Sequence, residues 1–454
     1  MAKKRLLYIT AFSLTQFGGV VRNGIEIYEK AGLDVDLLTL YGFPGQKSNH
    51  FSVYPRTREM MNADLRRKIA DIPLLKSIYR FFYPLKKITA TCETSKYLRS
   101  GDIAVVLEDE SKPVVSNELI LSKITKEYDY FLLYGWQDMM SAATVEAIYD
   151  KFHKPIMIAC ADMYQFTGNC FYTADCDKYQ DECWNCPVFA ERLNKDQAHK
   201  NFLFKKRVYE KTGCYITVNS HQKKYLLQSG IINEEQILNS VSTINTDLYK
   251  PLSVEACRKK FGVKQDKVYL LVRYIYPDSP EYSRKGMFLL DQSLKTVYSS
   301  LSKEERSRVV VMFAGVKSDM CSISYDFETI AIGILDIKNL IIAYNAASFF
   351  VCPSVDDAGP SMVVQSIACG TPVVAYDQGV ALDVIEDGYN GFKAKVGDYE
   401  EYAHCILRAL RLSKTDYAKM RENAREMSIR KTSYEAKNKQ TRERLAYIDS
   451  HFKG

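Results

Sequence analysis

The chain has 454 residues, of which 46% are apolar and 26% charged, proportions typical of a folded protein with two or three domains. No apolar run approaches the roughly 20 residues of a transmembrane helix, which excludes a membrane-spanning protein. The 62 basic and 55 acidic residues leave a net charge of +7, too small for a nucleic-acid-binding protein unless it is concentrated.

Short apolar segments alternate with helical patterns along the first half of the chain. The predicted strands are residues 6–10, 35–40, 131–134, 155–159 and 215–218. This alternation predicts βαβ units and a parallel sheet covered by helices on both faces. No secretory cleavage site follows the first strand, so we expect a cytoplasmic protein with reduced cysteines.

A basic segment, residues 56–90, interrupts this pattern. Between positions 56 and 87 it has nine basic residues against three acidic ones, and aromatic residues lie beside its last cations. Such a segment can insert its apolar side into a lipid surface while its cations contact anionic headgroups. The alternative is a helix that packs against its own domain. We expect peripheral contact with an anionic membrane.

Four cysteines gather in the polar segment 167–188, namely Cys170, Cys176, Cys183 and Cys186. Their spacing ends in C-x2-C, which turns tightly enough for two sulfurs to face one ion, as in tetrahedral structural zinc sites. Two disulfides or four free thiols are the alternatives. We expect no catalytic role, because a closed four-sulfur site has no open position for a substrate.

The second half repeats the alternation, with predicted strands at residues 268–272, 309–313, 347–352 and 372–375. A proline-containing turn segment at 245–252 separates the halves. The prediction is therefore two doubly wound α/β domains. We place them at residues 1–248 and 249–430, followed by a C-terminal helix, 431–454, that returns to the first domain.

Residues 349–397 contain the clearest functional motif. A buried strand is followed by Asp357, a Gly-Pro pair and a helix, whose first-turn N–H groups lack helical partners. Ligands of open α/β sheets bind at the carboxyl ends of strands, so we expect a pyrophosphate here. The predicted contacts are Gly359, Pro360, Ser361 and Met362. A plain strand-loop-helix unit with an aspartate cap is the alternative.

This motif resembles the donor-site signature of family 4 of the GT-B glycosyltransferases, which use nucleotide-sugars in bacterial polysaccharide assembly. The match includes Pro353-Ser354, Asp357, Gln365 and Cys-Gly-Thr-Pro-Val-Val at 369–374. Where the family usually has two Glu residues, this chain has Asp357 and Gln365. The resemblance implies the GT-B fold, two Rossmann-like domains facing a central cleft. It also implies that the transferred sugar contacts Asp357 and the ribose contacts Gln365.

Two further segments resemble parts of the same family. Lys285, followed by Gly286, resembles the Lys-Gly whose lysine contacts the diphosphate, a role suited to a mobile positive charge. Arg284 or Arg273 would supply a second charge. Gly18-Gly19, after the first strand, resembles the glycine loop that faces the donor.

Residues 159–170 resemble a subset of the family that begins this segment with His-Asp-Met and shares the cysteine spacing. In this chain Ala161 stands at the histidine position. Asp162 is then the nearest group able to accept a proton from an acceptor hydroxyl. The alternative for Asp162 is a carboxylate that caps its loop.

The sequence thus predicts a metal-independent glycosyltransferase of hexosyltransferase type, with Asp162, Lys285 and Asp357 as catalytic residues, and the resemblance to family 4 implies that it retains the anomeric configuration. It would transfer a sugar from a nucleotide diphosphate-sugar to a saccharide acceptor, lipid-linked, at the inner face of the cell membrane. We expect no catalytic cofactor and no nucleic-acid partner. The second hypothesis, favoured by Ala161 and Gln365, is a catalytically degenerate GT-B subunit that binds a partner or glycan. A third is a membrane- or nucleic-acid-binding protein that merely uses the fold.

Overall fold

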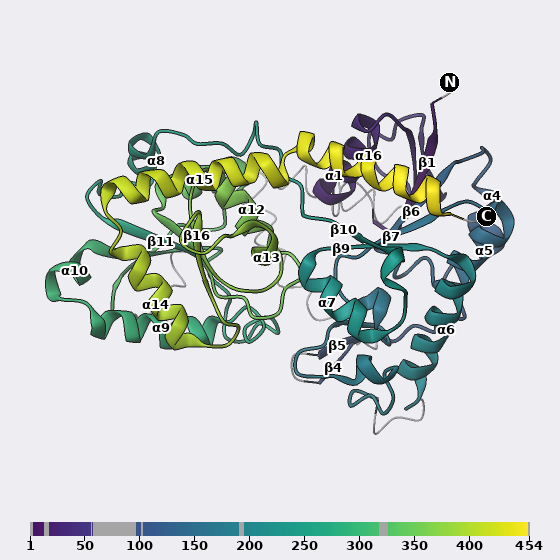
Figure 1. Cartoon of the computed structure of the whole chain (residues 1–454), viewed down its shortest axis with the longest axis horizontal. Coiled ribbons are helices and arrows are strands. Elements are labelled where there is room, and N and C mark those ends of the chain that lie inside the picture. The colour runs from purple at the N-terminus through teal and green to yellow at the C-terminus, as the bar shows by residue number, and fades with distance from the viewer. Residues whose placement is uncertain are drawn as a thin grey trace, which may run out of the picture.

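Two parallel β-sheets, one in each half of the chain, form the frame of the protein (Figure 1). The computed structural model describes residues 3–12, 18–55, 57, 97–100, 103–189, 195–316 and 326–452. The architecture below is that of these residues.

In the described N-terminal half, a seven-stranded parallel sheet has the order β10-β9-β7-β6-β1-β2-β3. Its strands are β1 (Arg5–Thr10), β2 (Asp34–Tyr41), β3 (His50–Tyr54), β6 (Tyr130–Tyr134), β7 (Ile156–Ala159), β9 (Tyr215–Val218) and β10 (Ile237–Asn239). A small antiparallel sheet joins β4 (Tyr97–Ser100), β5 (Ile103–Val106) and β8 (Cys170–Tyr172). The helices are α1 (Gly18–Lys30), α4 (Asn117–Ser122), α5 (Ala142–Phe152), α6 (Gln197–Thr212) and α7 (Ser220–Ser229), with 3-10 turns η2 (Tyr164–Phe166), η3 (Lys178–Asp181) and η4 (Glu234–Gln236).

In the described C-terminal half, a six-stranded parallel sheet has the order β13-β12-β11-β14-β15-β16. Its strands are β11 (Val268–Arg273), β12 (Val309–Ala314), β13 (Glu328–Ala331), β14 (Phe349–Cys352), β15 (Val373–Tyr376) and β16 (Gly391–Ala394). The helices are α8 (Val254–Lys260), α9 (Met287–Ser300), α10 (Lys303–Arg308), α11 (Ile337–Ala346), α12 (Ser361–Ala368), α13 (Ala381–Val384), α14 (Tyr399–Leu410), α15 (Lys414–Thr432) and α16 (Tyr434–His451). The prediction of two doubly wound α/β domains is confirmed.

Each sheet is buried on both faces, which explains why its central strands are continuously apolar. In β1, Leu7 and Ile9 join the apolar cluster on one face, while Leu6 and Tyr8 join the cluster on the other. All four side chains are almost fully buried. Side chains of a strand point alternately to opposite faces, so one short strand contributes to two cores.

All nine predicted strands are present, each with ends within two residues of the prediction. Four strands of the two large sheets were not predicted: β3, β10, β13 and β16. Each lies at the edge of its sheet, where no other strand of the described residues pairs with its outer flank, and three of them are only partly buried, as in β13 with its exposed Glu328. Their apolar pattern is therefore weaker than that of the central strands.

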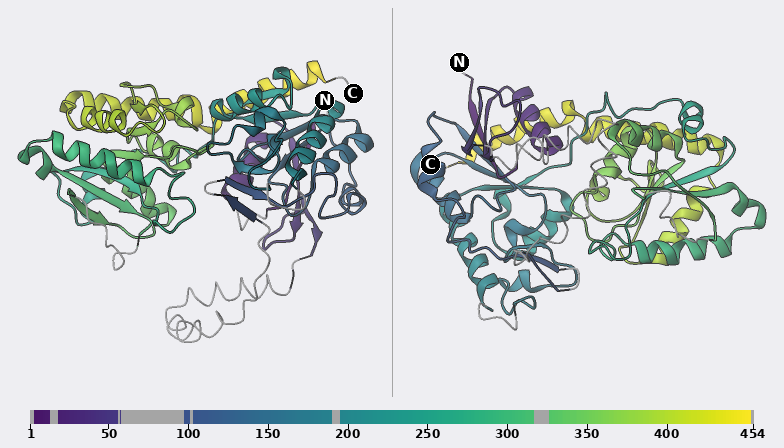
Figure 2. Two further views of the ribbon diagram at one scale, coloured as in Figure 1. Left: turned by 90° about the horizontal axis from the view of Figure 1, so that it is seen from below. Right: turned by 180° about the vertical axis from the view of Figure 1, so that it is seen from behind.

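The C-terminal helices connect the two halves of the molecule. Figures 1 and 2 show α15 along the C-terminal half and α16 along the N-terminal half. Ser433 separates the two helices, and its hydroxyl caps α16 by accepting from the Ala436 N–H at 3.1 Å. Leu445 and Ile448 of α16 pack into the N-terminal core, so the end of the chain helps to bury the first sheet.

The linker between the halves passes beside this helix joint. The Ile244 N–H donates to the carbonyl of Thr432 at 2.9 Å. The buried ammonium of Lys437 donates to the carbonyl of Val241, also at 2.9 Å. The two places where the chain crosses between the halves are therefore hydrogen-bonded to each other.

Candidate functional site

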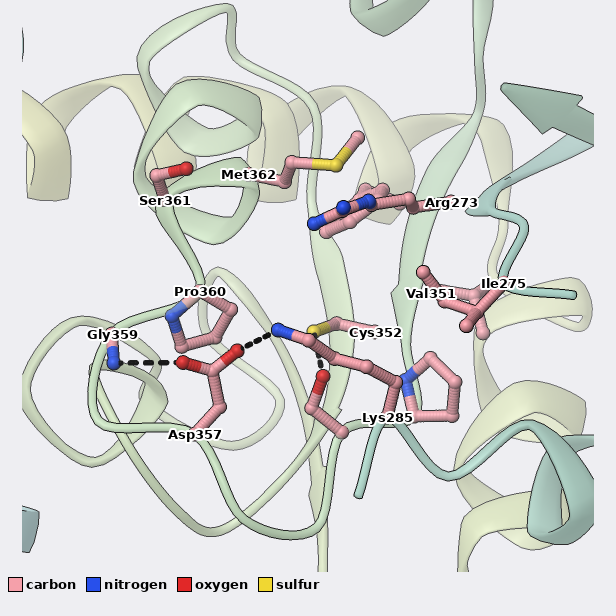
Figure 3. Close-up of a pocket in the computed structure, with 13 residues that line it drawn as sticks. Arg273, Ile275, Lys285, Val351, Cys352, Asp357, Gly359, Pro360, Ser361 and Met362 are labelled. Carbon is pink, nitrogen blue, oxygen red and sulfur yellow. Dashed lines mark hydrogen bonds and ion pairs between the residues drawn. The ribbon is translucent and has the colours of Figure 1, made fainter. Parts of the chain in front are cut away.

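A pocket lies at the carboxyl ends of β11 and β14, the neighbouring strands at which the C-terminal sheet reverses its order (Figure 3). From here β12 and β13 follow in one direction, and β15 and β16 in the other. Open α/β sheets bind ligands at such switch points, because adjacent loops diverge there. The pocket brings together seven predicted residues: Arg273, Lys285, Asp357, Gly359, Pro360, Ser361 and Met362.

The ammonium of Lys285 and the carboxylate of Asp357 form an ion pair in this pocket (Figure 3). Both side chains are mostly buried. Two glycines support this geometry. Gly286 has φ +66°, and a Cβ there would lie 1.8 Å from the carbonyl oxygen of Pro353. A Cβ on Gly379, with φ +55°, would lie 2.2 Å from the carbonyl oxygen of Asp357. Only glycine fits at either position.

Helix α12 begins at the pocket with Ser361 and Met362. Its N-cap residue is Pro360, whose side chain makes no capping hydrogen bond. The first-turn N–H groups of a helix have no partner within the helix, and the helix dipole favours negative charge at this end. Lys285 and these amides thus form a surface suited to phosphate oxygens.

The two candidate arginines have different surroundings. Arg273 lines the pocket, and Figure 3 shows its side chain beside Met362. Arg284 does not line the pocket, and its side chain is 9% exposed. Its guanidinium donates to the carbonyl of Asp356 and to the carboxylate of Glu281, each at 2.9 Å. The structure therefore favours Arg273 as the second cation of the pocket.

Gln365 lies outside the residues that line the pocket. Its Oε1 accepts a hydrogen bond at 2.8 Å from the hydroxyl of Tyr344, which is fully buried. The side chain is half-buried, so its amide nitrogen is the group left for a ligand. A contact between Gln365 and a ribose stays a prediction.

On the N-terminal side, Gly18 and Gly19 begin α1 just after β1. Asp162 follows β7, and its Oδ1 accepts from the Tyr164 N–H at 2.9 Å, as the loop-capping alternative expects. Burial raises the pKa of Asp162 to about 7, an effect that this hydrogen bond and Lys205 oppose. A carboxyl group with this pKa is suited to accept a proton near neutral pH. Loop capping and proton transfer are compatible here.

The N-terminus of α7 was not predicted as part of the site. Its N-cap Asn219 donates to the carbonyl of Ala358, and the hydroxyl of Ser220 donates to the carboxylate of Asp383. His221 is 8% exposed, and burial lowers its pKa to about 4, with Asp357 acting in the opposite direction. The only sequence signal was Asn-Ser-His after a strand, which also fits an ordinary helix cap.

The cysteine-rich segment has its sulfurs mostly buried. Cys170, Cys183 and Cys186 are 5 to 7% exposed, all four cysteines are free thiols, and the Gly168 N–H donates to the sulfur of Cys183 at 3.0 Å. Among the described residues, no group of three His, Cys, Asp or Glu side chains is arranged to hold a metal ion. The zinc site stays a prediction.

The predicted membrane-contact segment, 56–90, lies outside the described residues except for Thr57. Of the helices that the structure describes, none is both long and apolar enough to cross a membrane.

Two α/β domains, each built on a parallel sheet covered by helices, define the GT-B fold. The comparison with solved structures confirms this fold. The chain is similar to sucrose-phosphate synthase from Thermosynechococcus elongatus, with a TM-score of 0.61 and 15% identity over 99% of this chain and 100% of the other. It is also similar to Anabaena HepE in complex with UDP-glucose, with a TM-score of 0.56 and 13% identity over 97% and 99% of the two chains.

Residues 290–427 match the family described as glycosyl transferases group 1, a region that contains Asp357 and α12 but begins after Lys285. The D-inositol 3-phosphate glycosyltransferase of Streptosporangium roseum is 28% identical over 182 residues, 36% of this chain and 39% of the relative. The putative glycosyltransferase EpsD of Bacillus subtilis is 24% identical over 213 residues, 43% and 51% of the two chains. The chain spans about half the length, or less, of these curated relatives.

Proposed function

We propose that the protein is a GT-B glycosyltransferase that transfers a sugar from a nucleoside diphosphate-sugar to a saccharide acceptor. The observation that carries this proposal is the position of Lys285, which faces the start of α12 in a pocket at the switch point of the C-terminal sheet. The match to the group 1 glycosyl transferases and the UDP-glucose bound by HepE support a sugar donor of this class.

The donor diphosphate contacts Lys285, Arg273 and the first-turn amides of α12. Charge grows on the diphosphate oxygen as the bond to the sugar breaks, and fixed positive groups stabilise that charge most in the transition state. The transferred sugar lies against Asp357. The ribose hydroxyls accept from the amide nitrogen of Gln365, while its oxygen keeps the bond from Tyr344.

Asp162 takes the proton in the chemical step. An acceptor hydroxyl attacks the anomeric carbon from the same face that the diphosphate leaves, the bond from that carbon to the diphosphate oxygen breaks, and the electron pair leaves with the nucleoside diphosphate. The hydroxyl proton passes to the Asp162 carboxylate, whose pKa of about 7 leaves it largely ionised above neutral pH.

The resemblance to family 4 extends the proposal in three respects. The anomeric configuration is retained, the acceptor is carried on a lipid, and the product enters cell-surface polysaccharide synthesis. The basic and aromatic composition of residues 56–90 supports contact with the anionic inner face of the membrane.

The test incubates the purified chain with UDP-, GDP- and ADP-sugars and follows nucleotide release, with and without a saccharide acceptor. We expect release from one donor, and a loss of about a hundredfold or more in Lys285→Ala and Asp357→Ala. Lys295→Ala, on the exposed side of α9, is the matched control and should keep full activity. Release that neither site variant changes would overturn the assignment.

The second candidate is a GT-B subunit that binds a nucleotide-sugar or glycan without transferring it. The ion pair supports this candidate, because Asp357 neutralises Lys285 in the described structure. Ala161, which offers no proton-accepting group, supports it as well. Donor binding by calorimetry together with no nucleotide release, with any acceptor tested, would favour this candidate over the enzyme.

A further inference from the structure

A turn of the N-terminal domain, residues 172–174, contacts the loop that carries Asp357 in the C-terminal domain. The guanidinium carbon of Arg284 lies 4.0 Å from the ring centroid of Tyr172. Two residues later, the Ala174 N–H donates to the carboxylate of Asp356 at 3.3 Å. The 172–174 turn therefore contacts two different loops of the opposite domain, one through a cation–π interaction and one through a hydrogen bond.

Arg284 holds the loop that follows β14. Its carbonyl accepts from the N–H groups of Val355 at 3.0 Å and Asp356 at 3.3 Å. Its guanidinium donates to the Asp356 carbonyl at 2.9 Å and lies 3.9 Å from the carboxylate of Asp357. The main chain and side chain of Arg284 thus hold residues 355–357 in place. Arg284 is also directly followed in the sequence by Lys285.

The 172–174 turn is itself held to the segment that carries Asp162. The Met163 N–H donates to the carbonyl of Phe171 at 3.0 Å, and the hydroxyl of Thr173 contacts the sulfur of Met163 at 3.8 Å. Ala174 has φ +47°, a left-handed conformation that a non-glycine residue adopts at a cost of about 1 kcal/mol. Thr173 accepts from the Cys176 N–H at 2.8 Å, which stabilises this turn.

Charges from both domains act on Tyr172. Burial and the carboxylates of Asp357, Asp162 and Asp356 raise the pKa of its phenol, and Arg284 lowers it. The phenol therefore stays neutral at physiological pH. Its ring covers Arg284, whose carboxylate partners among the described residues, Glu281 and Asp357, belong to the C-terminal domain.

We propose that Tyr172 is a positioning residue, which connects the loop of Asp162 to the loop of Asp357 by covering Arg284. The ring holds the guanidinium in place, and the guanidinium fixes residues 355–357 beside Lys285. Donor binding then depends on a residue of the opposite domain that does not line the donor pocket. The expected effect of Tyr172 on donor binding rests on the proposed function. Its expected effect on the order of the 355–357 loop rests only on the contacts described above.

Hydrogen–deuterium exchange of the ligand-free protein tests loop order. In Tyr172→Leu, which lacks an aromatic ring, we expect the amides of residues 355–359 to exchange several-fold faster than in the wild type. Tyr172→Phe keeps the ring and should leave these rates unchanged. Arg284→Lys keeps the charge without the planar guanidinium and should act like Tyr172→Leu, so the proposal stays testable if one variant fails to fold. Unchanged rates in Tyr172→Leu or Arg284→Lys, or faster exchange in Tyr172→Phe, would overturn it.

Calorimetry with UDP and GDP tests donor binding. We expect Tyr172→Leu to bind the better of the two nucleotides roughly three- to tenfold more weakly, the range of a partly buried cation–π contact, with rescue by Tyr172→Phe. Equal affinity of wild type and Tyr172→Leu would overturn this consequence. If the wild type binds neither nucleotide and does not bind ADP, the proposed function fails, while the exchange rates still decide the role of Tyr172.

Discussion

Lys285 and Asp357, which are 72 positions apart in the sequence, form an ion pair in the pocket at the carboxyl ends of β11 and β14. The pair has a direct consequence for ligand binding. An anion that approaches Lys285 must share the ammonium with a carboxylate or displace it, so part of the attraction between Lys285 and a diphosphate is offset before the ligand arrives.

Asp357→Asn should therefore separate binding from transfer. Removal of the competing carboxylate should tighten UDP or GDP binding about fivefold, the value of a modest ion pair, while sugar transfer falls because the carboxylate no longer contacts the sugar. Calorimetry and a transfer assay on the same samples measure both effects. Asp377→Asn removes an exposed partner of Lys393 outside the pocket and should change neither. Weaker nucleotide binding in Asp357→Asn would contradict this account of the pair.

Asp162 should give the acid limb of the pH–rate profile. Its pKa of about 7 predicts that transfer declines as the pH falls below 7 and the carboxyl group takes up a proton. Asp162→Asn keeps the acceptor for the Tyr164 N–H and should lower the transfer rate by about a hundredfold or more. Its residual rate should no longer depend on pH in this range. An unchanged acid limb in Asp162→Asn would assign the proton transfer to another group.

His221 should make the fold less stable in acid. Its pKa in the folded protein, about 4, lies below the ordinary value of 6.5, so the unfolded chain binds the proton more readily. Stability is then lost as the pH falls from about 6.5 towards 4. His221→Gln should show a smaller drop in melting temperature between pH 7.5 and pH 5 than the wild type. Equal drops in the two proteins would mean that His221 is not the group responsible.

Lys205 and Glu110 form a fully buried ion pair, with Nζ and Oε1 3.5 Å apart, behind the loop that carries Asp162. The ammonium also donates to the carbonyl of Tyr164 at 2.6 Å. Lys205→Met leaves the carboxylate without its counter-charge and should destabilise the protein by about 3–5 kcal/mol in urea denaturation. The neighbouring Lys206 is a third exposed and pairs with Glu182, so Lys206→Met should cost less than about 1 kcal/mol. Similar losses in the two variants would contradict the difference in burial.

The cysteine cluster is tested by elemental analysis of protein purified without chelators. We expect zinc in equimolar amount, and its loss in a variant with serine at Cys183 and Cys186. All four thiols are free in the structure, an arrangement that fits either a zinc site or four reduced cysteines. Wild-type protein with far less than stoichiometric zinc would exclude the metal site and leave four reduced cysteines.

The parts of the site that could be predicted are those specified by neighbouring residues. Asp357, Gly359 and Ser361 belong to one strand-loop-helix unit, whose geometry follows from the local sequence, and all three line the pocket. The central strands were predictable for a related reason, since burial on both faces makes each of them an uninterrupted apolar run.

Distant contacts limited the remaining predictions. Arg284 was grouped with the donor residues because it precedes Lys285, yet its ring partner, Tyr172, lies more than a hundred positions earlier in the chain. The partner of Gln365, Tyr344, comes from a different helix, α11. His221 is placed near the donor loop by packing between domains, which no local pattern encodes. Side-chain partners of this kind follow from the tertiary structure and not from spacing.

The hydrogen bond between Ile244 and Thr432 also bears on how the two halves can move relative to each other. The chain passes between the two halves twice, once in the linker and once at Ser433, and both passages lie together at one edge of the molecule. Because both connections lie at this point, we expect the halves to rotate about it, whereas sliding past each other would strain both connections. Cleavage at Ser433 would remove one of the two connections and leave the halves covalently joined by the linker alone.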